Sequence, residues 1–283
     1  MYPLYLPNMK RQLKEGFKPE GTPDMKYYAF DWDDNIVHMP TKIMLQTEDG
    51  GEIGMSTDDF AEYRHDVGKT PFKYKGETIV GFTESPFRFF KTDGDKDFIV
   101  DSMKARKGPA FDDFKEAINN GSIFSIITAR GHHPKTLKKA IYNYIISGFG
   151  GIDKDELVKN LKKYRTFVDE DDMSDDELIK SYLELNRYHP VTFGEGSAAN
   201  PEELKVSAAK EFQNYVKDIS KKIGGSPFFK NDISNRFIPK IGFSDDDLRN
   251  LKTIDTELTK DPENIYQLYS THGGEKKPYK SDD

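Results

Sequence analysis

Three carboxylates stand directly after a short apolar run early in the sequence. Residues 25–30, MKYYAF, have the composition of a buried strand, and Asp31, Asp33 and Asp34 follow it. Such crowding is unfavourable on its own, because neighbouring carboxylates repel each other and raise each other's pKa. A divalent cation removes this repulsion, and Mg²⁺ prefers hard oxygen ligands. The stretch therefore predicts a strand that delivers acidic groups to a metal site.

Two further predicted strands also end in polar groups. Residues 122–128, SIFSIIT, end in Thr128, and residues 237–243, FIPKIGF, are followed by the acidic run SDDD. In an open parallel sheet, ligands bind beyond the carboxyl ends of the strands. We therefore expect these groups to meet the acids at 31–34 along one edge of a sheet.

The remaining core segments alternate predicted helices with predicted strands. Proline or asparagine stands at the start of several predicted helices, and glycine follows their ends. The alternation predicts an α/β fold, a three-layer Rossmann-like core in which helices cover both faces of a parallel sheet. The predicted helices cover residues 109–121, 134–148, 200–225 and 245–258, and the predicted strands cover 25–30, 122–128, 189–194, 237–243 and 264–270.

Two segments do not follow this alternation. Residues 38–108 contain a predicted hairpin at 42–55, with an Asp-Gly-Gly turn, and a short helix at 56–64. We interpret this segment as an inserted cap domain, and residues 152–188 as a helical insertion. The predicted divisions are an irregular lead-in at 1–24, a core at 25–37 and 109–271, the cap at 38–108 and a disordered tail at 272–283.

Composition excludes several classes of protein. The 283 residues include 42 Lys and Arg against 49 Asp and Glu, a net charge of −7 that argues against broad binding to nucleic acid or anionic membranes. The chain has no Cys, which excludes disulfides, thiolate metal sites and a cysteine nucleophile. No apolar run reaches the length of a bilayer span, and the first residues lack the order of a signal peptide. We therefore expect a soluble, cytoplasmic protein.

Taken together, these motifs resemble those of the haloacid dehalogenase-like (HAD) superfamily of hydrolases and phosphatases. Four features carry the resemblance in the right order: FDWDDNI at 30–36, IITAR at 126–130, a lysine in the helix before the fourth strand, and SDDD at 244–247. Two positions depart from the family pattern. Asp34 stands where the family usually has Gly, and Asn35 stands where it usually has Thr or Val.

The resemblance implies a Mg²⁺-dependent phosphatase that works through an aspartyl-phosphate intermediate. Asp31 would attack phosphorus, and Asp33 would protonate the leaving oxygen and then take a proton from water. Thr128 would donate a hydrogen bond to a phosphate oxygen near the start of the following helix. A lysine would neutralise the anion and keep Asp31 ionised. Lys205 is preferred for this role and Lys210 is the alternative, because Lys205 lies in the first turns of its helix.

The resemblance also implies the ligands of the metal. They are Asp31, the backbone carbonyl of Asp33, and one acid of the SDDD run. Asp246 is the preferred acid, because Asn250 follows it at the family's spacing for a second polar residue, and Asp245 is the alternative. We interpret Arg130 as a surface or structural residue, and His132 and His133 as solvated histidines.

The expected substrate is a phosphorylated small molecule. One alternative is a non-enzymatic scaffold or binding protein with the same fold. Another is a phosphatase that acts on the ends of nucleic acids, which the net charge of −7 disfavours. Basic residues of the predicted cap would suit that second alternative, namely Arg64, Lys73, Lys75 and Arg88. No membrane partner is expected.

Overall fold

The computed structural model describes residues 26–165, 173–194, 200–224, 239–261 and 264–280. Its main sheet contains β1 (Lys26–Phe30), β8 (Phe124–Thr128), β9 (Arg187–Pro190), β10 (Lys240–Asp245), β11 (Tyr266–Ser270) and β12 (Lys277–Pro278). The strand order is β12-β11-β10-β1-β8-β9. Every neighbouring pair is parallel except β11 and β12. The strand at the centre, β1, therefore has parallel neighbours on both sides.

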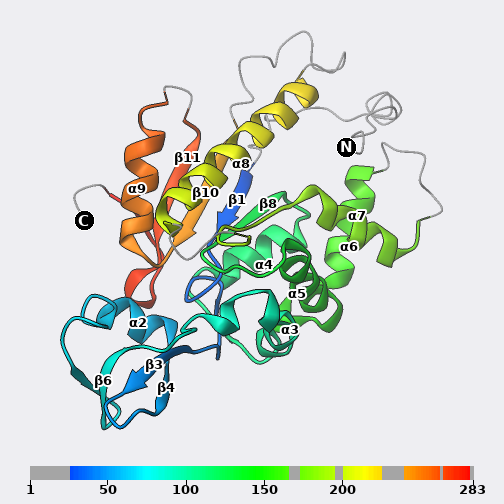
Figure 1. The fold of residues 1–283 in the computed structure, drawn as a ribbon. Coiled ribbons are helices and arrows are strands. Elements are labelled where there is room, and N and C mark those ends of the chain that lie inside the picture. The colour runs from blue at the N-terminus through cyan, green and yellow to red at the C-terminus, as the bar shows by residue number, and fades with distance from the viewer. Residues whose placement is uncertain (1–25, 166–172, 195–199, 225–238, 262–263, 281–283) are drawn as a thin grey trace, which may run out of the picture.

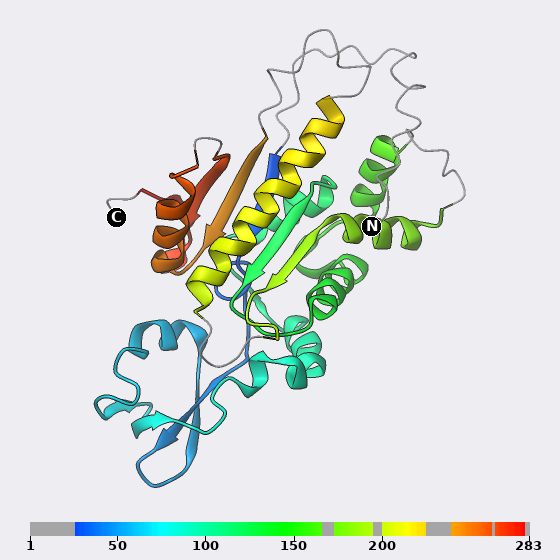
Figure 2. The same ribbon diagram turned by 45° about the horizontal axis from the view of Figure 1, so that its top comes forward.

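Helices cover both faces of this sheet (Figures 1 and 2). They are α3 (Asp95–Ser102), α4 (Phe111–Asn119), α5 (Pro134–Ser147), α6 (Lys154–Arg165), α7 (Asp175–Leu185), α8 (Pro201–Gly224) and α9 (Leu248–Leu258). Buried side chains of α3 to α7 share one hydrophobic cluster, and those of α8 and α9 share another. The described chain is thus an α/β protein with a sheet between two helical layers.

The alternation of side chains along β1 separates the two clusters. Phe30 packs in the cluster of α4, where its ring meets Phe114 edge-on at 5.6 Å. Tyr27 and Ala29 point to the opposite face and pack in the cluster that contains Phe212 of α8. A central parallel strand is buried on both faces, so its sequence is apolar throughout rather than alternating. This explains why β1 and β8 were predictable as short apolar runs.

A second, smaller sheet lies at the end toward which the parallel strands run (Figure 1). It contains β3 (Ile43–Thr47), β4 (Glu52–Met55), β5 (Phe72–Tyr74) and β6 (Glu77–Phe82), with α2 (Thr57–Tyr63) beside them. The strands are antiparallel in the order β4-β3-β6-β5. The hairpin and the short helix predicted from sequence are both present. The unit has a hydrophobic cluster of its own, built around Leu45, Met55 and Ile79.

A short antiparallel ribbon stands where the chain enters and leaves this region. β2 (Val37–His38) pairs with β7 (Arg106–Lys107). The remaining short elements are 3₁₀ turns: η1 (Arg88–Phe90), η2 (Thr92–Gly94), η3 (Phe149–Gly151) and η4 (His272–Gly274). We refer to residues 38–108 below as the insertion, but its last helix, α3, packs with α4 to α7 in the core cluster and not with the small sheet.

The prediction of a disordered tail at 272–283 is wrong for residues 272–280. This segment forms η4 and β12, and the backbone N–H of Tyr279 donates to the carbonyl of Leu268 at 2.9 Å. The Tyr279 ring packs against the cluster on the α8 and α9 face. The polar composition of the tail misled the prediction, because an edge strand offers unpaired backbone groups to any neighbouring segment. The lead-in predicted at 1–24 lies outside the described residues.

Residues 152–188 also differ from the interpretation as an insertion on the core. Leu157 of α6 and Leu178 and Ile179 of α7 are buried in the same cluster as α4 and α5. The two helices therefore form part of one helical layer. The third strand begins at Arg187 and ends at Pro190, earlier than the predicted range of 189–194. Among the described residues, none of the helices combines the length and the apolar character needed to cross a membrane.

We expect the C-terminal strand to contribute to stability. Removing residues 275–283 should lower the Tm, because it uncovers the β11 edge and removes the packed Tyr279 ring. The size of the shift follows from about 2–4 °C for each kcal/mol lost in a protein of this size. Thermal unfolding by circular dichroism measures it. Lys277→Ala is the control, because that side chain is 70% exposed, and an unchanged Tm in the truncated protein would contradict the prediction.

Candidate active site

Asp31 and Asp245 lie side by side at the carboxyl ends of β1 and β10. The parallel register places Phe30 beside Ser244, and the Asp31 N–H donates to the Ser244 carbonyl at 2.9 Å. The next residue on each strand is therefore an aspartate at the same level. Both carboxylates are buried, with exposed fractions of 5% for Asp31 and 0% for Asp245. This is the meeting of strand ends that the sequence predicts.

Lys205 of α8 reaches between these two carboxylates. Its Nζ lies 3.1 Å from Asp31 Oδ1 and 2.7 Å from Asp245 Oδ2, and the residue is only 1% exposed. Burial lowers the pKa of Lys205, but the charges of Asp245 and Asp31 outweigh it, so the pKa lies above the ordinary value. Lys210 has a side chain that is 48% exposed and lies 3.6 Å from Glu257 on the surface. Of the two predicted lysines, the structure brings Lys205 to the acids.

A third carboxylate completes an acidic cluster. One oxygen each from Asp31, Asp245 and Asp246 lie within 4.8 Å of one another. Three carboxylates against one Lys205 leave two uncompensated negative charges at full ionisation. Burial raises the pKa of Asp31 to about 7 against the opposing effect of Lys205, with a further rise from Asp245. Burial, Asp245 and Asp31 raise the pKa of Asp246 well above its ordinary value.

The cluster suits a divalent cation by its chemistry. All of its donors are carboxylate oxygens, the ligands that Mg²⁺ takes. Asp31 Oδ1, although 3.1 Å from Lys205 Nζ, receives no well-directed hydrogen bond from the described residues. A buried carboxylate oxygen without such a partner is costly. A cation with two positive charges would satisfy that oxygen and balance the net charge of the cluster.

Asp245 is the better satisfied of the two neighbouring acids. Its carboxylate accepts from Lys205, from the Asp247 N–H at 2.9 Å, and from Asn250 Nδ2 at 3.0 and 3.2 Å. Asn250, which the spacing argument linked to Asp246, donates to Asp245, the acid five residues before it, so the spacing argument stays untested. The preference for Asp246 as metal ligand stays a prediction, and it now rests on the saturation of Asp245.

The two departures from the family pattern have physical explanations. Asp34 has φ 54°, a left-handed conformation that glycine adopts freely and aspartate tolerates. Asn35 is fully buried and donates from Nδ2 to the Asp31 carbonyl and to Ser244 Oγ, both at 3.0 Å. Its Oδ1 accepts from Thr271 Oγ1 at 2.9 Å. The Asn35 amide thus ties together the chain at the ends of β1, β10 and β11.

Asp33 is held by an arginine. Arg130 Nε donates to Asp33 Oδ2 and Arg130 Nη2 donates to Asp33 Oδ1, both at 2.7 Å. The Arg130 side chain is 1% exposed, so of the two interpretations the surface residue is wrong and the structural residue agrees with its burial. His132 is fully buried beside Arg130, so the interpretation of His132 as solvated is wrong.

Thr128 ends β8 at the same edge of the sheet. The register places Phe30 beside Ile126, so Thr128 stands two residues beyond the end of β1, level with the acids. The residue is 1% exposed, and its Oγ1 accepts from the Arg130 N–H at 3.4 Å. Apart from Lys210, the alternative lysine, the residues predicted for the site from sequence therefore lie at the carboxyl ends of these strands.

Two contacts of the site were not predicted from the sequence. Asn35 links the ends of three strands, and Arg130 binds Asp33. Asn35 had one signal, because it is followed by the apolar residues Ile36 and Val37, and a polar amide that is buried must find hydrogen-bond partners. No pattern in the sequence distinguishes Arg130 from a surface residue. Comparisons with protein-family models, with curated proteins and with solved structures found no match to this chain.

We expect Asp246→Ala to weaken Mg²⁺ binding more than Asp245→Ala. The Asp246 carboxylate has fewer hydrogen-bond donors around it, whereas removal of Asp245 leaves Asn250 without its acceptor and Lys205 with Asp31 alone. Asp245→Ala should therefore cause the larger fall in Tm. Calorimetric Mg²⁺ titration and thermal unfolding of both variants measure the two effects. A larger loss of Mg²⁺ affinity in Asp245→Ala would assign the ligand to Asp245.

The raised pKa of Asp31 predicts how stability depends on pH without a divalent cation. A carboxyl group with a folded pKa of about 7, against 3.8 ordinarily, binds its proton more tightly in the folded state. The contribution of Asp31 to the free energy of unfolding is therefore fully present below about pH 4 and is lost as the pH rises through 7. Asp31→Asn removes that loss, so in EDTA its Tm advantage over the wild type should grow between pH 5 and pH 8.

The size of this advantage should be a few kcal/mol, since one pKa unit corresponds to about 1.4 kcal/mol. Scanning calorimetry at both pH values measures it. Asp112→Asn serves as the control, because that side chain is 82% exposed. A constant difference between Asp31→Asn and the wild type would show that Asp31 carries no such penalty.

Proposed function

We propose that this protein is a Mg²⁺-dependent phosphatase of the HAD type, with a Rossmann-like core, that hydrolyses a phosphomonoester through an aspartyl-phosphate intermediate. The observation that supports it most is Asp31, buried between Lys205 and Asp245 with Asp246 in reach of a shared cation. A structural ion pair needs two charges. This cluster has three carboxylates and one ammonium, which is the arrangement expected for binding a cation and an anion together.

Each residue has a role in the proposed reaction. A carboxylate oxygen of Asp31 attacks phosphorus, and the bond to the leaving oxygen breaks as Asp33 gives that oxygen a proton. Asp33 then takes a proton from water, which attacks phosphorus and frees Asp31. Lys205 and the Thr128 hydroxyl hold phosphate oxygens. Mg²⁺, held by Asp31, Asp246 and the Asp33 carbonyl, would supply positive charge to the transferring group.

Asp33 can serve this reaction while it is bonded to Arg130. A carboxylate has about four lone-pair positions, and the two hydrogen bonds from Arg130 use two of them. The other two can face a leaving oxygen or a water molecule. The position of Asp33 at the sheet edge, with a side chain 15% exposed, is consistent with such access.

The position of the insertion favours a small substrate, and we propose that it is a cap. Arg64 of the insertion lies 3.5 Å from Asp247 and 3.7 Å from Glu202, so the insertion contacts the loop that carries the acidic cluster. The buried Asp31 is more accessible to a compact phosphate ester than to a nucleic-acid strand. A phosphorylated small molecule is therefore the proposed substrate.

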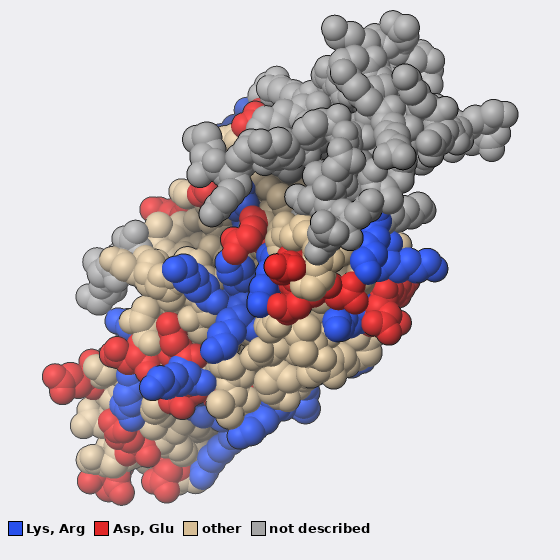
Figure 3. Space-filling view, turned by 90° about the vertical axis from the view of Figure 1, so that its right-hand side faces the viewer, with Lys and Arg blue, Asp and Glu red and all other residues tan. Residues whose placement is uncertain are grey.

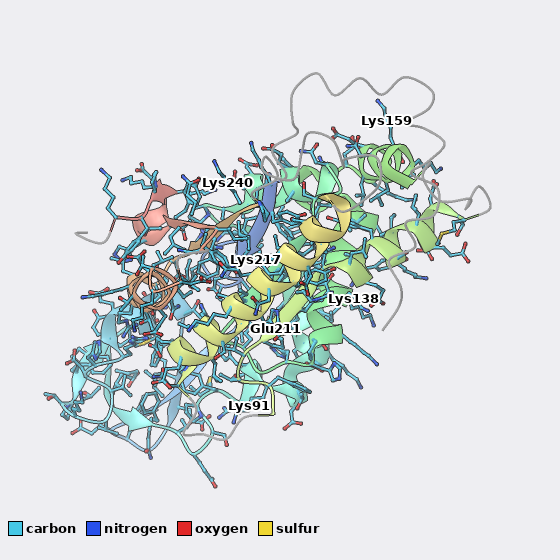
Figure 4. All side chains as sticks on the ribbon, turned by 90° about the horizontal axis from the view of Figure 1, so that it is seen from above. Lys91, Lys138, Lys159, Glu211, Lys217 and Lys240 are labelled. Carbon is cyan, nitrogen blue, oxygen red and sulfur yellow. The ribbon has the colours of Figure 1, made fainter. Side chains whose placement is uncertain are left out.

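The charge distribution is a further argument against a nucleic-acid substrate. Lys and Arg gather in the middle of the face in Figure 3, but Asp and Glu lie beside them. Lys138 lies 2.5 Å from Glu184, and Lys217 lies 3.6 Å from Asp261; both lysines are labelled in Figure 4. Paired lysines contribute less to the binding of a phosphate backbone than free ones.

The proposal predicts hydrolysis of 4-nitrophenyl phosphate that requires Mg²⁺ and stops with EDTA. Asp31→Asn should abolish turnover, and Asp33→Asn should lower it by about 10²–10⁴-fold, the usual worth of general acid–base catalysis. Release of 4-nitrophenol measures both, with Asp112→Asn as the exposed control. A broad panel of phosphate esters without turnover, with Mg²⁺ bound and the fold intact, would instead favour the scaffold alternative.

A further inference from the structure

We propose that Arg130 is a positioning residue for the proposed reaction, through which the insertion holds Asp33 in place. The inference rests on the proposed function, because it assigns the support of the acid–base group of that same site. The inference is based on two sets of contacts that Arg130 makes. One set is formed with Asp33, and the other with residues of the insertion.

Two aromatic rings of the insertion enclose the Arg130 guanidinium. Its Cζ lies 4.5 Å from the centre of the Phe90 ring and 5.0 Å from that of Phe98. Cation–π contacts of this kind are stronger where water is excluded, and Arg130 is almost fully buried. The backbone strengthens the link, since the Gly131 N–H donates to the Phe90 carbonyl at 2.8 Å. The two rings therefore restrict the position of the guanidinium.

Hydrogen bonds set the rotation of the guanidinium. Besides the two bonds to Asp33, Arg130 Nη2 donates to Thr41 Oγ1 at 3.2 Å and Nη1 pairs with His132 Nε2 at 3.1 Å. Arginine can only donate, so His132 Nε2 must accept and its proton sits on Nδ1. That N–H donates to Asp95 Oδ1 at 2.9 Å, so a second residue of the insertion orients the pair.

The electrostatics of His132 agree with this assignment. Burial and the neighbouring Arg130 lower the pKa of His132 to about 4, against the opposing effect of Asp95. The imidazole is therefore neutral near pH 7 and remains an acceptor for Arg130. Of the residues 38–108 that contact Arg130 and His132, Phe90 packs in the cluster of the small sheet, whereas Asp95 and Phe98 lie on α3, which packs with α4 to α7. Arg130 connects these residues and Thr41 to Asp33, which follows the central strand of the core.

A positioning role follows from the geometry of a bidentate pair. Two parallel hydrogen bonds of 2.7 Å fix both the place and the rotation of the Asp33 carboxylate. The lone pairs of Asp33 that Arg130 does not use then have fixed directions relative to the site. A misplacement of 1 Å at a reacting group can cost about 10²-fold in rate. A lysine would supply one point charge in place of the fork and would not fix the rotation.

A double-mutant cycle tests whether Arg130 acts through Asp33. The variants are Arg130→Met, Asp33→Asn and the double variant, assayed with 4-nitrophenyl phosphate and Mg²⁺. We expect Arg130→Met to lower kcat by about 10²-fold with little change in KM. In the Asp33→Asn background the same change should have almost no further effect, because residues that act as one unit are not additive. Arg130→Lys should recover little of the loss.

A matched control is available on the neighbouring strand. Arg187 of β9 stacks on Tyr215 at 3.5 Å and donates to the carbonyls of residues 184–186, away from the acidic cluster. Arg187→Met should leave kcat close to the wild-type value. If Arg130→Met does not fold, Phe98→Leu provides the second variant. It removes a ring face from the guanidinium but keeps apolar volume, and it should lower kcat only where Asp33 is present.

The outcomes separate this inference from the proposed function. Losses that add fully in the double variants, or an Arg130→Met enzyme as active as the wild type, would overturn the positioning role alone. A folded, metal-bound wild type that hydrolyses no phosphate ester would overturn the proposed function and this inference with it. Non-additive losses in an active enzyme would support both.

Discussion

The ion pairs of Lys205 with Asp31 and Asp245 are the interactions on which the rest of the site depends. They join the carboxyl ends of two adjacent strands to the helix that covers them, in surroundings where neither charge is solvated. A buried ion pair is a poor source of net stability, because desolvation offsets the attraction. Its presence is better explained by function. A buried ammonium beside an unbalanced set of carboxylates provides charge of both signs at one point.

The polar groups around these ion pairs are of two kinds: those that hold the strand ends in place by hydrogen bonds, and those that would take part in the proposed reaction. Asn250 and the Asp247 N–H saturate Asp245, so this acid holds Lys205 and the β10 end in place. Asn35 holds the backbone of Asp31 in place through a hydrogen bond to the Asp31 carbonyl. Asp31 Oδ1 lacks a hydrogen-bond partner among the described residues, and Asp31 and Asp246 both have raised pKa values. The hydrogen-bonded part holds the strand ends in place, and the remaining carboxylate oxygens are those that would bind the proposed cation.

The insertion contributes to the site as well as lying beside it. Its aromatic rings enclose Arg130, and its Arg64 lies close to Asp247, next to the acidic cluster. The part of the insertion built on β3 to β6 and α2 has its own hydrophobic cluster, and such a unit can move relative to the core. Any such movement would act on Asp33 through Arg130. Asp33, the proposed acid–base group, is therefore physically coupled to the insertion.

The sequence by itself determined the strand-ending acids, the alternation of core elements, the hairpin at 42–55 and the candidacy of Lys205. These depend on local patterns, since apolar runs, turn residues and helix positions are read within a few residues. Only the tertiary structure decided that Asn250 bonds Asp245, that Arg130 holds Asp33, that α6 and α7 belong to the core, and that residues 277–278 form an edge strand. Each of these depends on partners distant in the chain or on side-chain direction. Local periodicity carries no information about either.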